Sequence, residues 1–101
     1  MKKKPWRSFP VPVAHTEWRV ELYKAQPYVD GDYCQGFCDY PKRRIGLWMN
    51  PNQEAMRACF WHEFSHALLY ELGRDDNADD HSLIEGMAIS IMGVRLKVDW
   101  L

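Results

Sequence analysis

The sequence of 101 residues has little net charge and no long apolar run. Thirteen basic residues stand against fourteen acidic ones, so no overall field draws the chain to nucleic acid or to an anionic membrane. Its apolar runs fall far short of the ~20 residues that a membrane span requires. We therefore expect neither nucleic acid nor a membrane among its partners.

Cysteine is scarce, and its count is odd. Cys34, Cys38 and Cys59 cannot all pair within one chain, so a disulfide framework is not expected. The basic start of the chain is not followed by the apolar stretch of about 7–15 residues that a secretory signal needs. Both features favour a reducing compartment, and we expect a cytoplasmic protein.

The length and the hydrophobic content of 47% are those of one globular domain. Pro5, Pro10 and Pro12 interrupt the first residues, so we expect residues 1–13 to form a solvated arm. No repeat or interior linker divides the remainder, which predicts a single domain over residues 14–101.

Three segments have the pattern of β-strands. Apolar and polar residues alternate from His15 to Tyr23 and again from Arg44 to Met49, as on a half-buried strand. The segment from Tyr33 to Tyr40 is aromatic and apolar, and the turn at 41–43 favours a hairpin between it and the last strand. We therefore expect a three-stranded sheet of antiparallel type.

Two helices are expected after the strands. Asn50 is a good N-cap and Pro51 suits a first helical position, with Gly73 as the stop after Leu72. A second helix is predicted from about residue 81 or 82 to about 94. Three strands followed by two helices predict an α+β fold, in which the sheet packs against the first helix and a C-terminal helix completes the domain.

The first predicted helix contains a motif that carries chemistry, His62-Glu63-Phe64-Ser65-His66. Residues four apart lie above one another on a helix, so His62 and His66 can reach one ion. Zinc accepts neutral imidazole nitrogen, and two such ligands make half of a tetrahedral site. Glu63 can then act as the general base toward a water whose pKa the Zn²⁺ lowers.

A third ligand is expected downstream, and the spacing leaves the choice open. Glu85 is the stronger candidate and His81 the weaker one; they are four residues apart on the second helix. Glu85 could instead close a capping box with Ser82. An aspartate from residues 75–80 is a further option. Cys34 and Cys38 could suggest a second metal site, although a packing role is the preferred interpretation.

The runs Trp61–Leu69 and Ile84–Ala88 resemble the smallest gluzincin metallopeptidases, the minigluzincins. They are particularly similar to short phage and bacterial proteins related to the ImmA/IrrE-type peptidases. The likeness covers roughly residues 15–95, with Ile45-Gly46-Leu47 in the strand that precedes the active-site helix. It implies zinc held by His62, His66 and Glu85, with Glu63 as the general base.

The function expected from these features is zinc-dependent hydrolysis of peptide bonds. An exposed strand edge within Tyr33–Tyr40 would pair with an extended peptide or protein substrate, and Tyr33, Tyr40 or Tyr70 could stabilise the oxyanion. The alternative is a regulatory module that recognises a partner protein without efficient proteolysis. Purely structural zinc is a third interpretation. A partner protein or a second copy could complete the substrate cleft.

Overall fold

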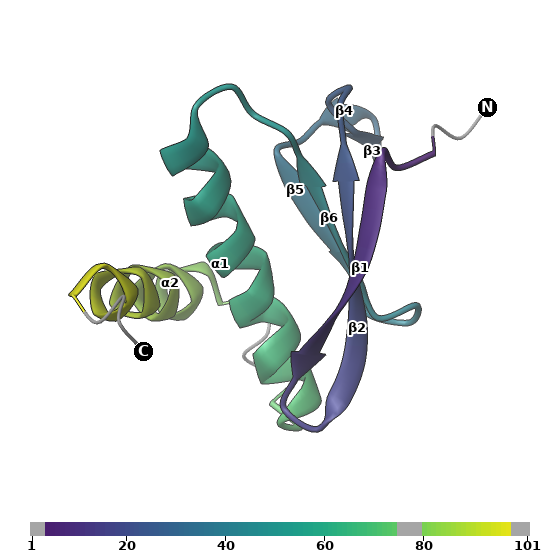
Figure 1. The fold of residues 1–101 in the computed structure, drawn as a ribbon. Helices are drawn as coiled ribbons and strands as arrows, with labels where there is room; N and C mark the ends of the chain where they lie inside the picture. Colours follow the sequence, from purple (N-terminus) through teal and green to yellow (C-terminus); the bar gives the residue numbers. More distant parts are fainter. Residues whose placement is uncertain (1–3, 75–79, 98–101) are drawn as a thin grey trace.

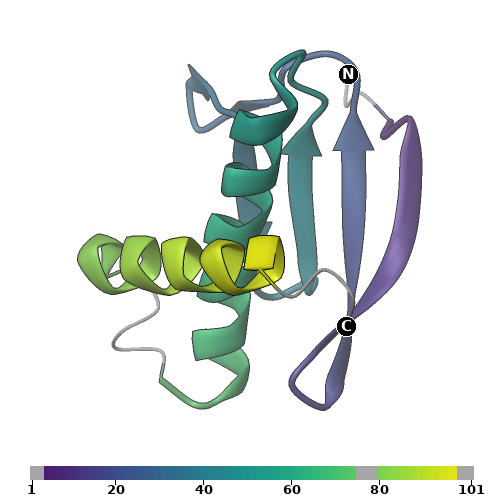
Figure 2. The same cartoon turned by 60° about the vertical axis from the view of Figure 1, so that its left-hand side comes forward.

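The structure, a computed structural model, describes residues 4–74 and 80–97, with side chains up to position 91. It is an α+β fold of three layers: a sheet, a long helix α1 against one sheet face, and a helix α2 that crosses α1 on the side away from the sheet (Figures 1 and 2). The elements in chain order are β1 (Arg7–Val13), β2 (Thr16–Tyr23), β3 (Tyr28–Val29), β4 (Asp32–Tyr33), β5 (Gly36–Asp39), β6 (Arg44–Trp48), α1 (Gln53–Glu71) and α2 (His81–Lys97).

The main sheet has four strands, in the order β1-β2-β6-β5, and it is mixed. The prediction of three antiparallel strands was therefore wrong in strand number and in direction, although the class was right. The expected hairpin exists, since β5 and β6 are antiparallel, but β6 runs parallel to β2. The reason is burial: Ile45, Gly46 and Leu47 are all buried, which suits a central strand, whereas β5 is only partly buried and lies at the edge.

Residues 7–13, expected to belong to a solvated arm, form the edge strand β1. Val13 is fully buried, and Val11 packs against the core on the same face. Pro10 and Pro12 occupy the alternate positions, and an edge strand tolerates proline because a missing N–H that faces solvent removes no ladder hydrogen bond. The prolines that suggested an arm are thus compatible with a strand.

The core lies between the sheet and α1. Its centre consists of five buried side chains, and apolar side chains of α1 pack around them. The buried residues are Val13, Trp18, Val20, Ile45 and Ala67, and the surrounding α1 residues are Phe60, Phe64 and Leu68.

Among the described residues, no helix is both long and apolar enough to span a bilayer.

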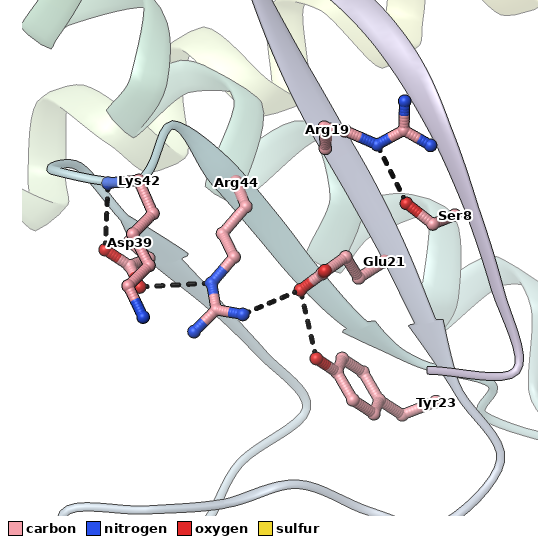
Figure 3. Close-up of polar contacts among 7 residues, drawn as sticks. All are labelled: Ser8, Arg19, Glu21, Tyr23, Asp39, Lys42 and Arg44. Atoms are coloured by element: carbon pink, nitrogen blue, oxygen red, sulfur yellow. Dashed lines mark hydrogen bonds and ion pairs between the residues drawn. The ribbon is translucent and has the colours of Figure 1, made fainter. Parts of the chain in front are cut away.

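The outer face of the sheet carries a polar network instead of a second layer (Figure 3). Arg44 pairs with Asp39 on β5 at 3.1 Å and with Glu21 on β2 at 3.2 Å, so it ties both neighbours of β6 together. Glu21 also accepts a hydrogen bond from Tyr23 at 3.0 Å. These partners satisfy one another, which explains how this face can remain exposed.

The helix boundaries agree with the predictions to within a few residues. The N-cap is Asn52, whose side chain accepts from the Ala55 amide, two positions after the predicted Asn50. Gly73 follows the C-cap with φ of 75°, as expected for a helix stop. The start of α2 at His81 agrees with its prediction, and the helix extends to Lys97 instead of about 94.

Candidate metal centre

The two histidines of the motif face each other across one turn of α1. Their Nε2 atoms are 3.2 Å apart. Two nitrogens bound to one zinc at about 2.0–2.1 Å in tetrahedral geometry would lie about 3.3 Å apart. The observed separation therefore fits a pair of ligands on one ion, as the i, i+4 spacing predicted.

Helix α2 brings both candidate third ligands to this pair. The His81 ring lies 6.0 Å from the His62 ring and 5.7 Å from the His66 ring, between centroids. One ligand nitrogen from each histidine lies within 4.8 Å of the other two. Glu85 Oε1 is 2.7 Å from His62 Nδ1, and the Glu85 side chain is 60% exposed. His81 thus offers a ligand atom beside both histidines of α1. Glu85 meets His62 at Nδ1, the nitrogen that does not face His66. The identity of the third ligand stays a prediction.

The competing explanations for these residues are less well supported. The capping box does not form as suggested, because Asp80 caps α2 by accepting from the Leu83 amide at 3.2 Å. Asp75, Asp76 and Asp79 lie outside the described residues. Within the described part of the chain, neither Cys34 nor Cys38 belongs to a cluster that could hold a metal. Cys38 packs against the core, which supports the packing interpretation.

The side chain of Glu63, on α1, lies against the edge strand β5. A Cβ placed on Gly36 would be 3.4 Å from Glu63 Cγ and 2.6 Å from the Cys59 sulfur, so glycine lets the strand approach the helix here. Burial raises the pKa of the Glu63 carboxyl to about 7, and the charge of the neighbouring His62 opposes that rise. A carboxyl that titrates near neutrality can both take and return a proton under physiological conditions.

Tyr40, one of three tyrosines considered as oxyanion partners, has a different place. Its hydroxyl is 3.3 Å from His66 Nδ1, a different ring nitrogen from the one that faces His62. Tyr70 stacks on the Tyr40 ring, and Tyr33 is 69% exposed on the β3–β4 hairpin. The contact between Tyr40 and His66 joins residues 26 apart, and no local sequence pattern reveals it.

Two hollows flank the first half of α1. A groove of about 340 Å³ lies on the α2 side, with His62 and Glu85 among its lining residues. A larger hollow of about 680 Å³ opens between α1 and the sheet, and its lining is mostly apolar. The smaller groove adjoins the histidine pair and is therefore the natural approach to the site. Its other lining residues are Gln35, Ala55, Ala58, Cys59, Ala88 and Ile89.

No family model, curated protein or solved structure matches this chain significantly. The side chains of the site nevertheless indicate which metal ion they could bind. Among the described residues, three imidazole nitrogens lie within 4.8 Å of one another, a donor set that zinc accepts, and two of them already have the separation that the ion requires. The residues present therefore fit zinc, with His62 and His66 as the part of the site that the geometry supports most directly.

Proposed function

We propose that this protein is a zinc-dependent metallopeptidase, a minimal zincin of the gluzincin type. The observation that carries the proposal is the pair of Nε2 atoms 3.2 Å apart, with the half-buried Glu63 on the same helix. His62, His66 and Glu85 hold the ion, and His81 is the competing third ligand. The resemblance of the motif-bearing segments to minigluzincins supports the same assignment.

The residues divide the work of hydrolysis. The proposed ligands would hold a zinc ion, which when bound would supply Lewis-acid chemistry toward a carbonyl and a water of lowered pKa. Glu63, beside His62 on the same helix, takes the proton of the attacking water and later delivers it to the leaving amine. The edge strand β5, beside Glu63, offers backbone hydrogen bonds to an extended substrate segment.

The cellular setting follows from the cysteines. All three are free thiols, which supports a reducing compartment, and we propose the cytoplasm.

The open groove beside His62 leaves room for a partner protein or a second copy to complete the substrate cleft.

Cleavage of a panel of unfolded proteins tests the function. The zinc-loaded protein should cleave members of the panel, and a chelator should stop it. Glu63→Gln should retain zinc and lose turnover by about 10²–10⁴-fold, the usual contribution of a general base. Glu54→Gln, at an exposed position in the first turn of α1, is the matched control and should cleave normally.

Two outcomes would contradict the proposal. If Glu63→Gln cleaved at the wild-type rate, Glu63 would not be the base. If the zinc-loaded wild type cleaved no member of the panel, the site would belong to a module that binds a partner protein through the same fold.

A further inference from the structure

The buried histidine of the pair, His66, is in contact with the hydroxyl group of Tyr40. Only 6% of His66 is exposed, and Tyr40, directly after β5, places its hydroxyl oxygen 3.3 Å from His66 Nδ1. The two residues come from different layers of the fold. The contact therefore ties the sheet edge to the helix at the point where the proposed site begins.

The position of that hydroxyl is fixed by its surroundings. The Tyr40 ring stacks on Tyr70 with centroids 4.8 Å apart, and its edge meets the fully buried Trp18 at 6.5 Å. Trp18 in turn donates its indole N–H to Glu71 at 3.0 Å, and Glu71 pairs with Arg43 at 2.7 Å. Tyr40 thus belongs to an aromatic cluster that is anchored on both the sheet and α1.

The chemistry of imidazole gives this contact a consequence. A neutral histidine can bind a metal only through the nitrogen that carries no proton, and the hydrogen bond made by the other nitrogen selects which one that is. When His66 Nδ1–H donates to the Tyr40 oxygen, the Nε2 lone pair points toward His62 Nε2. In the opposite tautomer, Nε2 would carry the proton and could not bind the metal.

We propose that Tyr40 is a positioning residue that holds His66 in the Nδ1–H form, with Nε2 oriented for the metal. This inference rests on the proposed zinc site and assigns Tyr40 a role distinct from an oxyanion donor. It holds whether Glu85 or His81 is the third ligand, because both candidates lie on α2, whereas Tyr40 contacts His66 from the sheet side.

Zinc affinity, measured by competition with a chromophoric chelator, tests the proposal. Tyr40→Phe removes the acceptor and keeps the ring, so zinc affinity should fall about tenfold, at the low end of the usual effect of losing such a partner. Tyr70→Phe removes the same atom from the ring stacked on Tyr40 and is the matched control; its affinity should stay within twofold of wild type. Thermal melting of both metal-free variants establishes that the fold is retained.

A second readout is spectroscopic and does not depend on zinc affinity. In the zinc-loaded wild type, ¹H–¹⁵N NMR should show a slowly exchanging His66 Nδ1–H, and Tyr40→Phe should lose it. Wild-type affinity in Tyr40→Phe, or the absence of this proton in the wild type, would overturn the role of Tyr40 and leave the peptidase proposal intact. A wild type that binds no zinc would overturn both, and one that binds zinc but cleaves nothing would overturn only the peptidase.

Discussion

The two halves of α1 differ sharply in their surroundings, and the motif lies where they meet. All of the buried residues of the helix, Ser65, His66, Ala67 and Leu69, lie in its second half. The first half has none, and it borders the two hollows of about 340 and 680 Å³. The side chain of His62, at the boundary, is 22% exposed.

This contrast explains how so short a chain can hold a site and still leave it accessible. His66 is held by the packed half, through Tyr40 and the core around Trp18. His62 faces the groove and meets Glu85 from α2. In the proposed site, the packed half of α1 would supply a fixed ligand and the open half the second ligand and the approach for substrate. The candidates for the third ligand lie on α2.

The largest expected effect is on the free energy of unfolding, which should respond differently to substitutions beside the two halves of α1. Trp18→Ala, on β2, empties the core against which the second half of α1 packs and should lower the free energy of unfolding by about 3–5 kcal/mol. Met56→Ala, in the open half beside the larger hollow, should cost only about 1 kcal/mol, because this side chain is partly exposed already. Urea denaturation measures both, and equal costs would show that the first half of α1 is packed as tightly as the second.

Glu63 should make the stability of the metal-free protein depend on pH. Its pKa is raised by burial from 4.5 to about 7 in the folded state, so that state binds more protons than the unfolded one between these values. Stability should therefore fall as the pH rises through this window. Glu63→Gln lacks this penalty and should be more stable than wild type above about pH 7, by on the order of 3 kcal/mol.

The same comparison provides its own control. The advantage of Glu63→Gln should vanish below about pH 4.5, where the wild-type carboxyl is protonated in both states. Urea unfolding at several pH values measures it, with Glu54→Gln as the exposed reference. If the difference in unfolding free energy between wild type and Glu63→Gln stayed constant across this pH range, burial would not raise the pKa of Glu63.

Substitutions on α2 should identify the third ligand, with a smaller effect in free energy. Glu85→Gln should reduce zinc affinity more than tenfold, or about 1.4 kcal/mol, because it removes a charged ligand. His81→Gln should reduce affinity less. The reverse order, measured by the same chelator competition, would make His81 the ligand and leave Glu85 as the hydrogen-bond partner of His62.

The helices could be predicted from the sequence because their signals are local. The motif, the capping asparagines and Gly73 all act within a few residues, and their positions agree with the structure to within a few residues. Helical spacing could place His81 and Glu85 on one face of α2, but which of them reaches the two histidines depends on how α2 packs on α1.

The sheet could not be predicted as well, because its pairing is not local. The parallel pairing of β2 with β6 joins residues about two dozen positions apart and depends on which strand is buried most, which only the assembled core decides. The strand β1 was hidden by prolines whose edge position becomes visible only in the paired sheet. The contact of Tyr40 with His66 depends on that same assembly.

The most direct test of the account is the zinc content of the purified protein after dialysis against a trace of zinc. The account predicts one zinc per chain for wild type and for Glu63→Gln, and none for His66→Ala with its fold retained by circular dichroism. A wild type that retained no zinc, or a His66→Ala variant that retained it fully, would contradict the claim that the two histidines of α1 form a metal centre.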